Sequence, residues 1–167
     1  MTSTTSAASL LAAAALSSSP HSFRTGIERT FICSDGIKLA AKHWTYNSNI
    51  DADDSQRGKV ICLHGWLDNC ASFHLLAPSL VNHSKEQGLA SEVVALDFPG
   101  HGLSSHKSAD NPTALLAEYC YYVSEAAEQL QWDKFSLVGH SMGAGVSVIM
   151  AAAFPDKVQS LVLLEGV

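Results

Sequence analysis

Ser141 stands at the centre of the motif Gly139-x-Ser141-x-Gly143, which follows the short apolar run Phe135–Val138. A serine hydroxyl can act as a nucleophile when a sharp turn between a strand and a helix lifts it clear of the sheet. The flanking glycines suit such a turn because they have no side chain to collide with neighbouring backbone. The first N–H groups of the following helix point toward the reacting oxygen. The motif therefore predicts that Ser141 is a nucleophile and that the Met142 N–H is one donor of an oxyanion hole.

A second candidate donor follows another apolar run, Lys59–Leu63, in the sequence His64-Gly65-Trp66. An oxyanion hole needs two N–H groups aimed at the developing negative charge, and one of them comes from the loop after an early strand. We assign this role to the backbone N–H of Trp66, with a simple pocket wall as the alternative role of this residue. We interpret His64 as a structural histidine of the loop and assign it no proton transfer.

The segment from Asp97 to Ser104 is rich in turn residues and also follows a predicted strand, where α/β proteins build their sites. One interpretation makes Asp97 a nucleophile or an acid and His101 its base. We favour a structural loop, because closeness in sequence does not give two residues complementary chemical roles. His140 is a poor candidate for the base of Ser141, since adjacent residues of such a turn point in different directions.

Apolar runs alternate along the chain with segments of helical periodicity. Runs without polar alternation are typical of strands buried on both faces of a parallel sheet, whose crossovers are right-handed. An Asp35-Gly36 turn between two alternating segments predicts an antiparallel hairpin at one edge. The predicted strands are Arg29–Cys33, Lys38–Trp44, Lys59–Leu63, Val93–Leu96, Phe135–Val138 and Val158–Leu164, and the predicted helices span about 70–82, from Asn111-Pro112 to about Leu130, and about 142–154.

In this order and at these spacings, the loop His64–Asn69, the Asp97 segment and the motif around Ser141 resemble the α/β-hydrolase superfamily, and most of all its serine hydrolase-like branch. The resemblance extends over residues 26–167. It implies an α/β-hydrolase fold, with a mostly parallel sheet and helices on both faces. It also implies hydrolysis of an ester or related acyl bond in a small-molecule substrate, by a Ser–Asp/Glu–His triad in that chain order.

The sequence departs from this family pattern after Ser141, because the residues that follow contain no histidine and only the acids Asp156 and Glu165. We therefore expect residues 26–167 to be an incomplete domain, truncated after about the sixth strand, with the triad base beyond Val167. Such a fragment is expected to be inactive. Glu165 ends the last strand, where certain haloalkane dehalogenases place the triad acid, and an ordinary strand-end carboxylate is the alternative. A truncated, non-catalytic binding form or pseudo-enzyme is the alternative to a hydrolase.

Residues 1–25 differ in composition from the rest of the chain. Residues 1–22 are almost only Ser, Thr, Ala and Leu, which cannot supply the large apolar groups of a core. The scarcity of acids suits an organellar transit peptide, whereas the scarcity of arginine and the absence of a basic start do not suit transit or secretory signals. We expect either a targeting segment or a disordered tail or misassigned start, and a cytoplasmic or organellar protein.

Composition excludes several classes of function. The net charge of −6 and the absence of a basic cluster argue against nucleic acid as a partner. The four cysteines form no C-x-x-C pair, so we expect free thiols in a reducing compartment and no metal site. The sequence contains neither a dinucleotide-binding nor a P-loop fingerprint, so it implies no cofactor. No apolar run is long enough to span a membrane, and the sequence leaves the oligomeric state open.

Overall fold

The protein is described here from a computed structural model covering residues 26–45, 58–87, 90–110 and 115–165, with only the backbone of 82–87. The expectations for the segment 1–25 lie outside these residues. Within them, no helix combines the length and apolar character that crossing a membrane would require.

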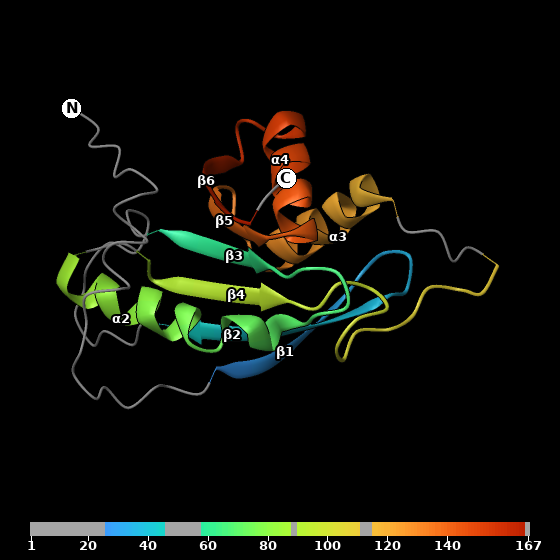
Figure 1. The fold of residues 1–167 in the computed structure, drawn as a ribbon, viewed down its shortest axis with the longest axis horizontal. Coiled ribbons are helices and arrows are strands. Elements are labelled where there is room, and N and C mark those ends of the chain that lie inside the picture. Colours follow the sequence, from blue (N-terminus) through green and yellow to red (C-terminus); the bar gives the residue numbers. More distant parts are fainter. Residues whose placement is uncertain (1–25, 46–57, 88–89, 111–114, 166–167) are drawn as a thin grey trace.

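A single sheet organises the described chain, with its six strands in the order β1-β2-β4-β3-β5-β6 (Figure 1). The pair β1–β2 is an antiparallel hairpin, β2 pairs antiparallel with β4, and the pairs β4–β3, β3–β5 and β5–β6 are parallel. This arrangement confirms the predicted α/β class, the edge hairpin and the number of strands. The strands are β1 (Ile27–Ile32), β2 (Lys38–Thr45), β3 (Lys59–Leu63), β4 (Glu92–Leu96), β5 (Phe135–His140) and β6 (Val158–Leu164).

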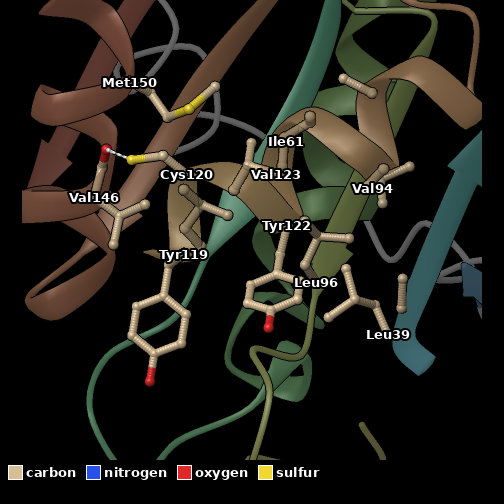
Figure 2. Close-up of a cluster of buried hydrophobic side chains, with 14 of the residues drawn as sticks. Leu39, Ile61, Val94, Leu96, Tyr119, Cys120, Tyr122, Val123, Val146 and Met150 are labelled. Carbon is tan, nitrogen blue, oxygen red and sulfur yellow. Dashed lines mark hydrogen bonds between the residues drawn. The ribbon is translucent and has the colours of Figure 1, made fainter. Parts of the chain in front are cut away.

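Helices cover both faces of this sheet, as expected for parallel strands joined by crossovers. One face packs against α2 (Leu76–Gln87) and the other against α3 (Leu116–Gln129) and α4 (Met142–Ala153). Figure 2 shows the core between the sheet and the helices α3 and α4, where side chains of these helices meet those of the central strands.

Strand β3 explains why its sequence is apolar without alternation. Ile61 and Leu63 face α3 and α4, whereas Val60 and Cys62 belong to the core under α2. Because both faces of the strand are buried from Val60 to Leu63, these four positions are apolar, and only Lys59 at its start is polar. The four parallel strands end on the same side of the sheet, and their carboxyl ends bring the predicted site residues together.

Two predicted helix boundaries are wrong. The segment 70–82 begins as a 3₁₀ turn, η2 (Cys70–Phe73), because the Asn69 side chain accepts a hydrogen bond from the Ala71 N–H and caps a separate turn before α2. Helix α3 begins at Leu116, after an extended Leu115, and not at the predicted Asn111-Pro112, a signal that lies outside the described residues.

At the amino end of the sheet, buried His43 of β2 places Nε2 2.9 Å from Glu92 Oε2 of β4. The His43 imidazole at this distance lowers the pKa of the Glu92 carboxyl, against the opposing effect of burial. A carboxyl whose pKa is lower in the folded state stabilises the fold above its unfolded pKa, and this contribution is lost as pH falls through the folded pKa.

We therefore expect Glu92→Gln to cost about 1 kcal/mol at neutral pH, measured by urea unfolding. The difference from wild type should shrink once the pH falls below the unfolded value of 4.5. Glu128→Gln, which removes a more exposed ion pair, is the control. A difference between Glu92→Gln and wild type that stays constant from neutral to acid pH would contradict this assignment.

Candidate active site

Ser141 is the single residue between the end of β5 and the start of α4, and its backbone has φ 49° and ψ −112°. This region is unfavourable for a residue with a side chain, so neighbouring contacts must hold it. The Ser141 N–H donates to the Leu164 carbonyl of β6 (3.0 Å), and its carbonyl accepts from the Ala144 N–H (2.9 Å). The sharp strand-to-helix turn predicted from the sequence is therefore present and is held from both sides.

Both glycines of the motif are required by close backbone contacts. A Cβ atom at Gly139 would lie 2.4 Å from the Gly143 carbonyl oxygen, and one at Gly143 would lie 2.1 Å from the Leu63 carbonyl oxygen. Real Cβ atoms do not approach other atoms this closely. The first turn of α4 therefore packs directly on the end of β3, which brings the loop after β3 beside Ser141.

Gly65 makes the contact between that loop and the turn. A Cβ atom at this position would lie 3.4 Å from Ser141 Cβ and 3.0 Å from His140 Nδ1. The first turn after β3 therefore lies against the candidate nucleophile. Trp66, the predicted second oxyanion donor, follows Gly65 directly in this loop.

His64 fixes the conformation of this loop from inside the protein. Its ring is fully buried, and its Nε2 accepts a hydrogen bond from the Phe98 N–H at 3.0 Å. The other ring nitrogen, Nδ1, must then carry the proton that it donates to the Gly65 carbonyl at 2.7 Å. Burial lowers the pKa of His64, which favours this neutral form. Both nitrogens are thus used by backbone groups, as expected for a structural histidine.

The Gly65–Trp66 peptide has a defined orientation as a result. The Gly65 carbonyl accepts from His64 and also from the Asp68 N–H at 3.3 Å. In a planar trans peptide the next N–H points opposite to the carbonyl, so the Trp66 N–H is turned away from His64 and Asp68. The indole of Trp66 is 62% exposed and meets the ring of His101 edge-on at 5.4 Å.

Asp97 links the loop after β4 to the loop after β3 through hydrogen bonds. Its buried carboxylate accepts from the Cys70 N–H (2.6 Å) through Oδ1 and from the Leu103 N–H (2.8 Å) through Oδ2. Burial and the nearby Asp97 charge raise the pKa of the Cys70 thiol to about 12, so this thiol stays neutral. His101 lies against the rings of His64 and Trp66, not against the Asp97 carboxylate. Both carboxylate oxygens of Asp97 are thus used by backbone groups, which supports the structural loop that we favour.

Glu165 follows β6 directly, with its Oε2 3.6 Å from His140 Nε2. This makes His140 its partner among the described residues. Within the same residues, no hydrogen bond joins the Ser141 hydroxyl to a histidine. The arrangement offers a strained serine beside two loops and a helix start, which suits attack on a carbonyl and stabilisation of the resulting oxyanion.

The described residues contain no group of three or more His, Cys, Asp or Glu side chains placed to hold a metal ion. All four cysteines are free thiols in the structure.

The family model for the alpha/beta hydrolase fold matches residues 59–166, from β3 through the last strand. The chain belongs to the α/β-hydrolase family. A serine hydrolase-like protein of Dictyostelium discoideum is 39% identical over 87% of this chain and 36% of its own length. A serine hydrolase-like protein of Danio rerio is 43% identical over 64% of this chain and 30% of its own. The chain thus spans about a third of these relatives.

Solved α/β structures share the arrangement of the same elements. A hypothetical protein from Pseudomonas aeruginosa superposes with a TM-score of 0.66 and 40% identity, covering 86% of this hydrolase chain and 44% of that one. The match confirms the predicted fold class, and the serine hydrolase-like relatives confirm the predicted branch.

The structure brings together three predicted site residues, Ser141, Met142 and Trp66, with the structural histidine His64, and it places Glu165 beside His140. The catalytic roles of Ser141, Met142, Trp66 and Glu165 remain predictions. Sequence reasoning missed Gly65 as the residue that contacts Ser141. The available signal was a glycine two residues after the end of a buried strand, because glycine there marks a close backbone approach.

Proposed function

We propose that this α/β-hydrolase chain carries the nucleophile and oxyanion half of a serine hydrolase that acts on an ester or related acyl bond. In this mechanism the Ser141 hydroxyl attacks the carbonyl carbon, and the N–H groups of Met142 and Trp66 stabilise the oxyanion. The observation that supports it best is Ser141 itself, held at φ 49° between β5 and α4 with the Gly65 loop against it. Backbone strain of this kind gathers at functional sites.

The general base is the missing part of this mechanism. The residues after Ser141 contain no histidine, and His64 uses both ring nitrogens for backbone groups. Since the serine hydrolase-like relatives are about three times as long as the matched region, we assign the base and its orienting acid to sequence beyond residue 167. Residues 1–167 alone are then expected to fall short of full activity.

A non-catalytic binding form is the second candidate, favoured by the absence of a histidine bonded to the Ser141 hydroxyl in the described chain. In that case the same loops would hold an acyl compound without cleaving it.

Ester turnover distinguishes these two functions. We would measure release of p-nitrophenol from acyl esters by the full-length gene product, by Ser141→Ala and by Ser108→Ala, which changes an exposed serine in a distant loop. The hydrolase predicts turnover in the wild type and in Ser108→Ala, and background rates in Ser141→Ala. Equal rates in all three, in proteins that melt cooperatively, would refute the hydrolase and leave the binding form.

A further inference from the structure

His140 and Glu165 come from neighbouring strand ends on either side of Ser141. His140 ends β5 and is paired in register with Leu164, the last residue of β6. Glu165 then turns out of the strand with φ 47°, a conformation uncommon for a residue with a side chain. This turn places its carboxylate 3.6 Å from His140 Nε2, with 87% of the glutamate side chain and 36% of the histidine side chain exposed.

The Nδ1–Cε1 edge of the His140 ring rests on the loop after β3. A Cβ atom at Gly65 would lie 3.0 Å from Nδ1 and 3.3 Å from Cε1 of this ring, which leaves no room between the imidazole and the Gly65 α-carbon. The ring therefore contacts Gly65, whose carbonyl already accepts hydrogen bonds from His64 and from the Asp68 N–H. Its position bears directly on the Gly65–Trp66 peptide.

A second carboxylate acts on His140 from this loop. Asp68 has a lowered pKa, mainly through its hydrogen bond from Ser72, and the charge of His140 adds to this lowering. The charged or titratable groups around His140 are thus Glu165 from the end of β6, Asp68 from the loop after β3, and His64 behind Gly65, which is buried and neutral. Protonated His140 is attracted by carboxylates on both sides of the turn.

We propose that His140 and Glu165 form a brace that holds the Gly65–Trp66 peptide in place beside Ser141. Glu165 acts through His140, and both are positioning residues; Glu165 is then not the acid of the triad. The Glu165 carboxylate limits where the His140 ring can lie, and the ring in turn limits the position of Gly65. The proposal rests on the proposed function, because the orientation of the Trp66 N–H matters for chemistry only if Ser141 reacts.

NMR of the full chain tests the brace without requiring activity. We would compare the Trp66 backbone amide of the wild type with that of His140→Gln and of Glu165→Gln at one neutral pH. Both substitutions should shift the Trp66 amide signal and speed its hydrogen exchange, because each removes one part of the brace.

Glu128→Gln is the matched control, since Glu128 pairs with Lys157 at the same 3.6 Å distance and is also largely exposed. It should leave the Trp66 amide signal and its exchange rate unchanged. Equal effects of Glu165→Gln and Glu128→Gln on the Trp66 amide would overturn the brace. So would a Trp66 amide that exchanges as slowly in His140→Gln as in the wild type. Because Glu165 is almost fully exposed, Glu165→Gln is expected to fold.

Labelling by a fluorophosphonate separates the brace from a triad-acid role. A positioning residue predicts that Glu165→Gln slows labelling of the full-length protein less than about tenfold, with rescue by Glu165→Asp. Loss of a triad acid lowers the rate by about 10⁴-fold, and a loss of that size would overturn the proposal. If the wild type is not labelled at all, the proposed hydrolase fails, and the NMR comparison of the Trp66 amide alone decides on the brace.

Discussion

Replacing Gly143 by alanine is expected to lower the free energy of unfolding by about 3 kcal/mol, near the upper end of the cost of overpacking a core. The added Cβ would lie 2.1 Å from the Leu63 carbonyl oxygen and 2.8 Å from the His64 carbonyl oxygen. Both neighbours are backbone atoms of the end of β3, so no side chain can rotate away. The helix α4 and the strand β3 must move apart, and the contact between the Gly65 loop and Ser141 is lost with them.

Gly145→Ala is the matched control for this substitution, because it changes the same residue type in the same helix. Its added Cβ would meet only Leu116 Cδ1, at 3.3 Å, the end of a flexible side chain. Alanine also favours the helix by about 1 kcal/mol over glycine, so this variant should be neutral or more stable. Urea unfolding measures both. Equal stabilities for the two variants would show that α4 does not pack on β3 as described.

Removing the Asp97 carboxylate is expected to have an effect of similar size. Asp97→Ala leaves the Cys70 N–H and the Leu103 N–H without their acceptor in a buried place. Hydrogen bonds to a charged group contribute about 1.5–3 kcal/mol each, so we expect a loss of about 3 kcal/mol in urea unfolding. Faster hydrogen exchange at the two freed amides should accompany this loss.

Two further substitutions make this prediction specific. Asp97→Asn keeps the shape and one acceptor, and should lose less stability than Asp97→Ala. Asp156→Ala changes an exposed aspartate after α4 and should stay within about 0.5 kcal/mol of wild type. If Asp97→Ala were as stable as Asp156→Ala, the carboxylate would not join the two loops. That outcome would also reopen the interpretation of Asp97 as a reacting group.

The sequence alone predicted the sheet well because burial on two faces leaves an unambiguous pattern. The run at β3 has no polar position after Lys59, since Val60 and Ile61 point into different cores. The Asp35-Gly36 turn predicted the hairpin because Gly36 must adopt φ 85°. Helix starts were predicted less well. The segment at 70–82 has one apolar periodicity, and the break after Phe73 depends on the capping of η2 by Asn69.

In the site as well, features set by neighbouring residues could be predicted, whereas contacts between residues far apart in the sequence could not. The turn at Ser141 could be predicted because its glycines are neighbours in sequence. The role of Asp97 as a clamp depends on Cys70 and Leu103, which only the folded sheet brings to its two oxygens. The contact between His140 and Glu165 likewise follows from the register of β5 with β6, which no local pattern contains.

The most direct test of a nucleophilic Ser141 is to map where a fluorophosphonate attaches. The full-length gene product would be treated with the probe, digested and sequenced by mass spectrometry, beside Ser141→Ala and Ser108→Ala. The account predicts a single phosphonylated serine, Ser141, in the wild type and in Ser108→Ala, and none in Ser141→Ala. An adduct on another serine, or no adduct on a protein with a cooperative melt, would contradict the assignment of Ser141 as the nucleophile.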